Sequence, residues 1–165
     1  MRLFIAIQMN EVMKDALVCM QDCMMNNNVH GNFTKEENLH LTLAFIGDYP
    51  DPDTILEVMD ASDYRPVKLS LDGIGHYNEV WYAGLADNKG LQAYVKRLRH
   101  CLADAGIPFD RKKFSPHITL IRKPQYHELS DMTDIVIPKI SMIADHVSLM
   151  CSDRGKNGMI YTEIR

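Results

Sequence analysis

Alternating and continuous hydrophobic segments along the chain predict a protein rich in short strands. Residues 2–7 are an apolar run typical of a buried strand. In residues 67–72, Val, Leu and Leu alternate with polar residues, which indicates a strand with one face in solvent. The turn-forming stretch DRGKNG separates the last two segments and predicts a hairpin. We expect strands at residues 2–7, 38–46, 67–72, 79–85, 116–121, 145–152 and 159–164.

Apolar residues at helical spacing predict three helices between these strands. Asn10 is a suitable N-cap for a helix over residues 11–25, in which apolar side chains recur along one face. Asp51-Pro52 combines a cap with proline at the first helical position and begins a short helix ending near Met59. A third amphipathic helix over residues 88–102 precedes Gly106 and Pro108.

A gapless repeat relates two parts of the chain. Positions 40 and 117 are 77 apart, and this single offset aligns a strand, a helix and a second strand of residues 2–46 with those of residues 79–123. An internal duplication is the simplest explanation. We therefore expect an α+β fold with one two-lobed domain over residues 1–165. Each lobe contains a copy of the strand-helix-strand unit, and a pseudo-two-fold axis relates the two.

The charge balance excludes one class of function. The chain has a formal net charge of -4, from 18 Lys plus Arg and 22 Asp plus Glu. A protein that coats long nucleic acid needs many contacts between cations and phosphates, so this function is not expected. Binding of a single phosphate or an RNA end requires only local positive charge, and the total does not exclude it.

Hydropathy and cysteine usage indicate a cytoplasmic protein. No segment approaches the roughly 20 apolar residues of a membrane span, and the N-terminus turns polar too soon for a secretory signal. The four cysteines are therefore expected as reduced thiols. Cys19 and Cys23 could share a metal on one helix face, but no second ligand pair has matching spacing, so no metal site is expected.

Two His-x-Thr segments carry the candidate chemistry. Side chains two apart in a strand share a face, so His40 pairs with Thr42 and His117 with Thr119 on the polar sides of their strands. A single His-x-Thr is weak evidence, because a half-buried strand can carry it without any chemical role. Two copies at the repeat offset are hard to explain by chance. The expected symmetry brings both pairs to one groove.

Two imidazoles facing one groove are suited to proton transfer, because the unperturbed pKa of histidine lies near neutrality. A neutral ring removes a proton from water, and a protonated ring donates one to the departing oxygen. A phosphodiester fits between them, with Thr42 and Thr119 donating hydrogen bonds to its non-bridging oxygens. This scheme needs no metal and no cofactor.

Basic residues flank the second motif. Arg111, Lys112, Lys113, Arg122 and Lys123 surround it, with Asp110 as the only nearby acid. For the lysines a solvated edge is the simpler interpretation. Arg122 is a better phosphate ligand because its planar guanidinium suits oxyanions. Strict alternation places it on the core face, so a bulge, the strand end or a curled side chain must bring it to the groove.

The motifs MRLFIAI, NLHLTLAFIG, FSPHITLIRK and KNGMIYTEIR resemble the 2H phosphoesterases, and most closely the bacterial RNA 2′,3′-cyclic phosphodiesterases. The resemblance spans nearly the whole chain. It implies two lobes with antiparallel-rich sheets facing a central cleft and helices outside. It also implies metal-free hydrolysis of a terminal 2′,3′-cyclic phosphate to a 2′-phosphate.

By motif position, the resemblance implies that His40 donates a proton to the leaving 3′-oxygen and that His117 is the base acting on water. Thr42 and Thr119 take the phosphate-binding positions, and Arg122 takes the basic position after the second motif. Phe45 matches an aromatic residue that contacts the nucleobase, and it is equally acceptable as a core residue. The pattern departs at Ser115, where many relatives carry Arg.

The substrates expected are RNA 3′ ends or small cyclic nucleotides, with no obligate protein partner evident. The same site also permits 2′-5′ RNA ligation or cleavage of 2′-5′ linkages. A non-catalytic module that holds RNA ends is a third hypothesis, but a pure phosphate binder would gain more from Arg or Lys. His76 and Tyr77 could border the cleft, and we do not assign them a role. Surface or structural positions are expected for His30, His76, His100, His127 and His146.

Overall fold

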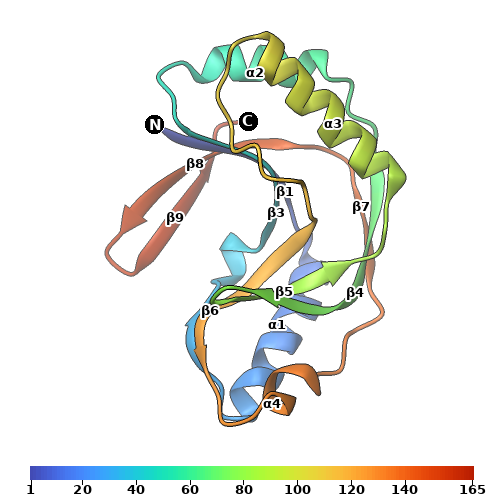
Figure 1. The fold of residues 1–165 in the computed structure, drawn as a ribbon, viewed down its shortest axis with the longest axis vertical. Coiled ribbons are helices and arrows are strands. Elements are labelled where there is room, and N and C mark those ends of the chain that lie inside the picture. The colour runs from blue at the N-terminus through green and yellow to red at the C-terminus, as the bar shows by residue number, and fades with distance from the viewer.

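Nine strands form two antiparallel sheets in the computed structural model, which describes residues 1–165 (Figure 1). One sheet has the order β3-β1-β8-β9 and the other β2-β6-β5-β4-β7. The strands are β1 (Arg2–Gln8), β2 (His30–Phe33), β3 (His40–Asp48), β4 (Val67–Tyr77), β5 (Val80–Leu85), β6 (His117–Gln125), β7 (Ser141–Ala144), β8 (Ser148–Gly155) and β9 (Gly158–Glu163). The expected α+β class and the closing hairpin are confirmed.

The three expected helices are present with their predicted caps. The Asn10 side chain accepts a hydrogen bond from the Met13 backbone N–H, and the Asp51 side chain accepts one from Asp53. Such contacts partner N–H groups that the first helical turn leaves free. The helices are α1 (Glu11–Asn26), α2 (Pro52–Ala61), α3 (Lys89–Asp104) and α4 (Ser130–Thr133), and a 3-10 turn spans Glu36–Asn38.

Each of the two long helices, α1 and α3, follows a strand of one sheet and packs against the other sheet. α1 follows β1 but contacts β6 and β7, whereas α3 follows β5 but contacts β3 and lies beside α2. Figure 1 places α2 and α3 at one end of the molecule and α1 and α4 toward the other, where the Asn27 side-chain amide donates to the Asp131 carbonyl oxygen. The helices therefore tie the two sheets together from outside.

Both His-x-Thr strands contain a β-bulge at the same relative position. The pairing of β1 with β3 skips Leu43, and the pairing of β5 with β6 skips Leu120. These two positions are 77 apart, the offset of the sequence repeat. A bulge resets the alternation of side chains. Phe45 therefore returns to the face of His40, and Arg122 to the face of His117.

Side chains from the long helices bind the carbonyl groups of the bulged residues. The Gln21 side-chain amide of α1 donates to the Leu120 oxygen at 3.0 Å, and also to the Thr34 oxygen at 2.9 Å. The Arg99 guanidinium of α3 donates to the Leu43 oxygen from Nε and Nη2, at 3.3 and 3.1 Å. Each bulge is thus held by a helix from the other half of the chain.

Two short edge strands and the full length of β4 were not predicted. β2 and β7 have four residues each and lie at opposite edges of the second sheet, where the pairing comes from tertiary context rather than from hydrophobic pattern. β4 continues past residue 72 to Tyr77 because its pairing with β5 shifts register between Leu71 and Ile74. Gly73 lies in this shift with a φ of 77°, a conformation that glycine adopts without strain.

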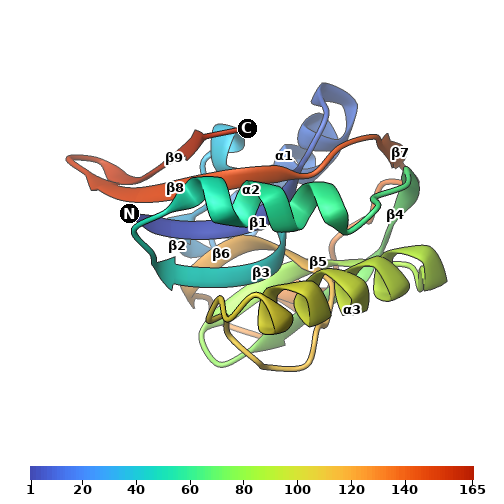
Figure 2. The same ribbon diagram turned by 90° about the horizontal axis from the view of Figure 1, so that it is seen from above.

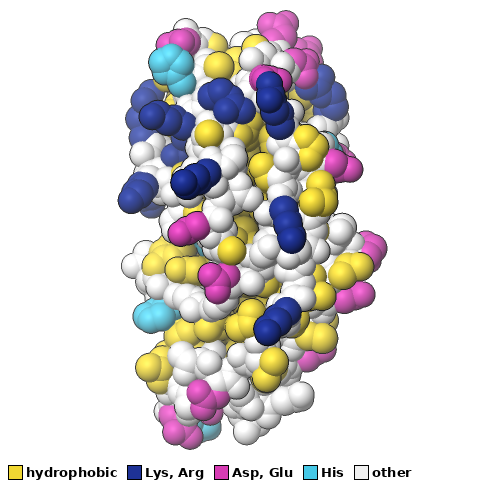
Figure 3. All heavy atoms as spheres, turned by 90° about the vertical axis from the view of Figure 1, so that its right-hand side faces the viewer, with side chains coloured by type: hydrophobic (Ala, Val, Ile, Leu, Met, Phe, Trp, Pro, Cys, Tyr) yellow, Lys and Arg dark blue, Asp and Glu magenta, His cyan; other side chains and the backbone are white.

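One continuous hydrophobic core connects the two sheets. It includes Leu41 and Leu43 beneath the first motif and Ile118 and Leu120 beneath the second. On the face drawn in Figure 3, hydrophobic side chains are interspersed with charged and polar ones, and Lys and Arg gather toward the end that carries α2 and α3. None of the helices is both long and apolar enough to cross a bilayer.

Candidate active site

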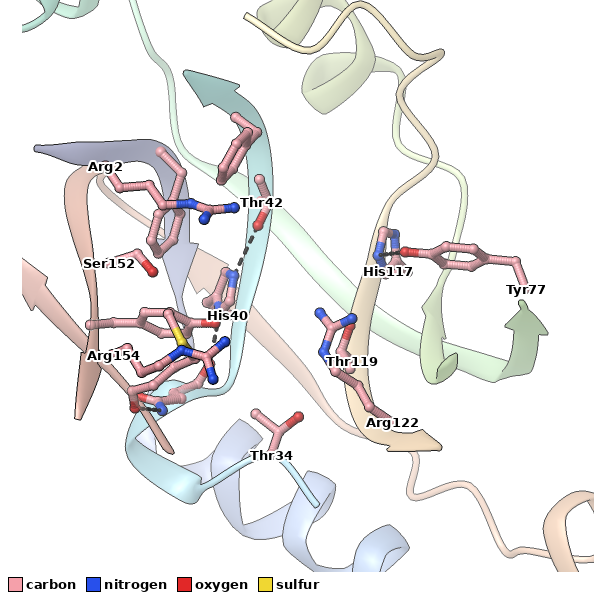
Figure 4. Close-up of a pocket in the computed structure, with 15 residues that line it drawn as sticks. Arg2, Thr34, His40, Thr42, Tyr77, His117, Thr119, Arg122, Ser152 and Arg154 are labelled. Carbon is pink, nitrogen blue, oxygen red and sulfur yellow. Dashed lines mark hydrogen bonds between the residues drawn. The ribbon is translucent and has the colours of Figure 1, made fainter. Parts of the chain in front are cut away.

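The two motif strands alternate between core and cavity as their sequences predict. Leu41 and Ile118 are essentially fully buried, whereas His40 and His117 are half-buried. β3 and β6 are neighbours in space, and Figure 4 shows the two histidines on opposite walls of one cavity. The groove expected from the repeat is therefore present.

This cavity, the central chamber, has a volume of about 510 Å³. No Asp or Glu lines it. The structure brings all six residues singled out in the sequence to its walls: His40, Thr42, Phe45, His117, Thr119 and Arg122. Arg122 arrives there through the bulge at Leu120, which settles the conflict with strict alternation.

The two imidazoles are held in the same way. His40 Nδ1 lies 2.6 Å from the Asn38 carbonyl oxygen, and His117 Nδ1 lies 2.8 Å from that of Ser115. A carbonyl oxygen only accepts hydrogen bonds, so Nδ1 carries the proton in both rings. Each neutral ring therefore presents Nε2 as its free basic nitrogen. This is the arrangement that proton transfer at a substrate requires.

Two aromatic side chains enclose the imidazole ring of His40. Its ring packs against Phe4 and Tyr161, with centroids 5.1 and 5.2 Å away. Burial lowers the pKa of His40, and the positive charges of His117 and Arg122 lower it further, against the opposing effect of the Asn38 carbonyl. His40 is thus predominantly neutral near pH 7, with its Nε2 accepting a hydrogen bond from the Thr42 hydroxyl at 2.9 Å.

Tyr77 contacts the second histidine. Its hydroxyl lies 3.4 Å from His117 Nε2, and the two rings meet edge to face with centroids 5.5 Å apart. The sequence left Tyr77 without a role, because it could not show that β4 extends this far. His76, beside it, faces elsewhere and stacks on Trp81 at 4.5 Å. The other four histidines outside the motifs are also exposed and line none of the cavities described here.

Two cations of the central chamber were missed in the sequence. Arg2 and Arg154 line it together with Arg122. The guanidinium of Arg2 lies 5.2 Å from the centre of the Phe45 ring. Arg2 shares a strand face with Phe4, and this alternation could have indicated its position from the sequence. Arg154 lies in the DRGKNG region, and the direction of its side chain depends on where the β8–β9 hairpin packs.

A second cavity of about 430 Å³, the aromatic chamber, adjoins the central one at Thr42, Phe45, Tyr77 and His117. Tyr82 and Phe114 line it as well, with Arg99 and Asp110. Lys112 and Lys113 also border this chamber and are exposed to solvent, so their interpretation as a solvated edge stays a prediction. Arg111 and Lys123 line none of the cavities described here.

Ser115 borders the aromatic chamber, and its backbone carbonyl is the group that anchors His117. Its side chain brings no positive charge to the site. All four cysteines are free thiols, and the structure contains no group of three or more His, Cys, Asp or Glu placed to hold a metal.

Comparisons with known proteins agree with this geometry. Residues 26–156 match the family model of the 2′-5′ RNA ligase superfamily. A Thermotoga maritima protein named RNA 2′,3′-cyclic phosphodiesterase is 28% identical, over 98% of this chain and 91% of the relative. A Methanocaldococcus jannaschii protein of the same name is 27% identical, over 100% and 99%.

Solved structures share the whole fold. TT0787 of Thermus thermophilus has a TM-score of 0.83 at 26% identity, covering 100% of this chain and 96% of that one. E. coli LigT complexed with 3′-AMP has a TM-score of 0.80 at 24% identity, covering 99% and 95%. The expected resemblance to the 2H phosphoesterases is thus confirmed. The chain belongs to the 2′-5′ RNA ligase superfamily, and it places its paired His-x-Thr strands around one cavity.

Proposed function

We propose that this protein is an RNA 2′,3′-cyclic phosphodiesterase that converts a terminal 2′,3′-cyclic phosphate into a 2′-phosphate. The observation that carries the proposal is the pair of carbonyl-anchored imidazoles, His40 and His117, on opposite walls of a cavity without acidic residues. The names of the Thermotoga and Methanocaldococcus relatives support the same activity. RNA 3′ ends, or small cyclic nucleotides, are the proposed substrates.

The proposed reaction uses the two Nε2 atoms in opposite senses. His117 takes a proton from water as the water oxygen forms a bond to phosphorus. His40 gives its Nε2 proton to the 3′-oxygen as the bond from phosphorus to that oxygen breaks. The product is a 2′-phosphate and a free 3′-hydroxyl, and exchange of one proton with solvent returns both rings to their starting states.

The proton on His40 requires the substrate. In the free protein, burial and the charges of His117 and Arg122 keep the pKa of His40 low. The negative charge of a bound phosphate offsets those positive charges and favours the protonated ring. Substrate binding and acid formation are therefore coupled in this proposal.

The phosphate oxygens are proposed to lie against Thr42, Thr119 and Arg122. All three line the central chamber, and Thr42 is already within 2.9 Å of His40 Nε2. Hydroxyl and guanidinium donors aimed at the non-bridging oxygens stabilise charge as the pentacoordinate phosphorus forms. Phe45 remains available to the nucleobase from the rim shared with the aromatic chamber.

The same site supports 2′-5′ ligation as the second candidate. In that reaction the 5′-hydroxyl of a second RNA replaces water and receives the phosphorus, while the 3′-oxygen leaves as before. The specific observation in its favour is the aromatic chamber, which adjoins His117 and offers space for a second nucleoside. The family's own description includes 2′-5′ RNA ligases.

The deciding experiment incubates EDTA-treated protein with an oligoribonucleotide that ends in a 2′,3′-cyclic phosphate. Hydrolysis adds the mass of one water, and chromatography of the product beside authentic 2′-phosphate and 3′-phosphate standards shows which oxygen keeps the phosphate. Ligation instead yields a longer product when a 5′-hydroxyl RNA is added. An unchanged cyclic end both with and without EDTA would refute the phosphodiesterase, and binding without turnover would indicate a non-catalytic module. A loss of activity with EDTA would refute the metal-free scheme.

Variants of the two histidines test their roles. His40→Ala and His117→Ala are each expected to lower the rate at least about 100-fold, the scale of a lost general acid or base. His100→Ala is the matched control, because that exposed imidazole pairs with Asp104 on α3, 3.2 Å away, and lines none of the three cavities. Equal losses in all three variants would contradict the assignment.

Free thiols at all four cysteines fit the proposed cytoplasmic location.

A further inference from the structure

A third cavity continues from the central chamber on the side opposite the aromatic one. This cavity, the basic trench, has a volume of about 780 Å³. One wall is the segment around β2 and the residues after it, and the other is the tip of the β8–β9 hairpin. Figures 1 and 2 both show this hairpin projecting beyond the rest of the molecule.

The charge of the trench is entirely positive. Lys35, Arg122, Arg154 and Lys156 line it, and no Asp or Glu does. None of these four side chains forms an ion pair within the protein. The chain as a whole has a net charge of -4. The four unpaired cations around this cavity therefore form a positively charged region on a protein of net negative charge. Such a surface attracts an extended anion.

The remaining lining suits a nucleic acid strand better than a simple anion. Phe33 and Tyr161 offer aromatic surfaces, and Asn32 and Asn157 offer amide donors and acceptors. Proteins that bind single strands combine a positively charged groove for the backbone with aromatic side chains for the bases. The trench contains both kinds of group along its length.

The trench leads directly to the proposed reaction centre. Arg122, Arg154 and Tyr161 line both cavities, and Figure 4 shows Arg122 and Arg154 reaching in from opposite walls. The Asn38 side-chain amide donates to the Met159 carbonyl oxygen at 2.9 Å and fixes the hairpin against the 3-10 turn. The aromatic chamber is less suited to a backbone, because Asp110 lines it and its Arg99 is engaged by carbonyl groups.

We propose that the basic trench binds the sugar-phosphate backbone of the RNA strand leading into the reacting 3′ end. The preferred substrate is then an oligoribonucleotide and not a mononucleotide. The inference rests on the proposed function for the identity of the reacting end. The binding surface itself is argued from the charge and shape of the trench alone.

The test removes two charges that lie in the trench and outside the central chamber. Lys35→Gln/Lys156→Gln is compared with the parent protein on a 2′,3′-cyclic mononucleotide and on an octanucleotide with the same terminal nucleotide. We expect kcat/KM for the octanucleotide to fall about tenfold at low salt and that for the mononucleotide to stay unchanged. Lys96→Gln/Lys139→Gln, which removes two exposed charges outside the three cavities, is the matched control.

Salt dependence gives a second, independent measure. Each backbone contact to a single strand contributes about 0.7 to the slope of log affinity against log salt concentration. The trench variant is therefore expected to lose about 1.4 from that slope, measured by fluorescence anisotropy with an octanucleotide that ends in a 2′-phosphate. Unchanged slope and affinity would overturn the proposal, as would equal losses on both substrates in the kinetic assay.

Binding and turnover separate the two proposals. If the parent binds the octanucleotide through these lysines but hydrolyses nothing, the trench stands and the phosphodiesterase fails. If the parent hydrolyses both substrates with equal efficiency and the variant matches it, the phosphodiesterase stands and the trench fails. Inorganic tripolyphosphate serves as the competitor. If it displaces the octanucleotide at lower concentration than an unlabelled octanucleotide does, a small-polyphosphate site replaces the RNA track.

Discussion

Arg99 connects the two halves of the candidate site, so its replacement is the most informative structural perturbation. From α3, its guanidinium donates to the Leu43 carbonyl oxygen in the bulge of β3 and to the Lys112 carbonyl oxygen at 2.6 Å. It also lies 5.9 and 5.8 Å from the ring centres of Phe109 and Phe114. One side chain thus holds both the first motif strand and the segment leading into the second.

Arg99→Met removes these polar contacts while keeping an unbranched side chain that can pack. Three hydrogen bonds from a half-exposed cation, at about 1 kcal/mol each after solvent screening, are worth roughly 2–3 kcal/mol. For a chain of this length that corresponds to a fall in Tm of about 4–12 °C. The segment before His117 also gains freedom, and we expect kcat/KM to fall about tenfold from the resulting misplacement of the imidazole.

The assays are thermal unfolding, hydrogen exchange of residues 109–116, and kinetics on the cyclic-phosphate substrate. Arg97→Met is the matched control on the same helix. Its guanidinium donates to the Ser62 and Asp63 carbonyl oxygens and lies 5.7 Å from the Tyr94 ring centre, away from the site. We expect the control to lower Tm without changing kcat/KM or the exchange of residues 109–116.

Arg99→Lys separates geometry from charge, because a lysine keeps the charge near the aromatic chamber but cannot make the forked contact. We expect it to behave like Arg99→Met in exchange and kinetics. Unchanged protection of residues 109–116 in Arg99→Met would refute the reasoning, since the segment would then be held by other contacts. Full activity in Arg99→Lys with a loss only in Arg99→Met would show that charge, and not position, is what the site needs.

The remaining predictions concern pH, the second bulge and Tyr77. The lowered pKa of His40 makes its protonated ring a minority form at neutral pH in the free protein, and bound phosphate is expected to raise that pKa. An NMR pKa of 6.5 or above for His40 in the free protein would contradict this reasoning. Because the pKa of His40 is lower in the folded than in the unfolded state, the unfolded state binds this proton first as the pH falls. The free energy of unfolding therefore decreases as the pH drops from about 6.5 toward the pKa of His40 in the folded protein. His40→Gln should flatten this dependence in denaturant titrations. Gln21→Met removes two hydrogen bonds to the carbonyls of Thr34 and Leu120, and we expect a loss of about 2 kcal/mol by urea unfolding, against no loss for the exposed Gln92→Met. Tyr77→Phe keeps the ring contact with His117 and removes the hydroxyl that lies 3.4 Å from its Nε2. We expect a several-fold change in kcat with an unchanged Tm. An unchanged pH–rate profile would exclude any influence of the hydroxyl on the imidazole.

The local pattern was sufficient to predict most of the regular structure. Alternation within His40-Leu41-Thr42-Leu43 places the polar side chains on one face whatever surrounds the strand, because the period of a strand is two. The caps at Asn10 and Asp51 were equally readable, since they depend on contacts within a few residues. The internal duplication stays a prediction, although the bulges at Leu43 and Leu120 recur at its offset.

Arg122 shows where local pattern stops. Its approach to the cavity depends on the skipped residue Leu120, and that bulge depends in turn on pairing with β5 and on the amide of Gln21 from a distant helix. The edge strands β2 and β7 have the same cause, because partners far away in the sequence provide their hydrogen bonds. The amino-acid composition of a single strand predicts neither the bulge nor the pairing of the edge strands.

By itself, then, the amino-acid sequence determined the faces of the two motif strands, and it predicted the family and the six residues that line the central chamber. The strand faces follow from short-range periodicity and residue chemistry, whereas Phe45 and the family came from the resemblance of the motifs. Only the tertiary structure decided that Tyr77, Arg2 and Arg154 join the site and that a basic trench runs out along the hairpin. Cavities form where surfaces from separate segments meet, and their shape follows from packing between elements and not from the order of residues within one.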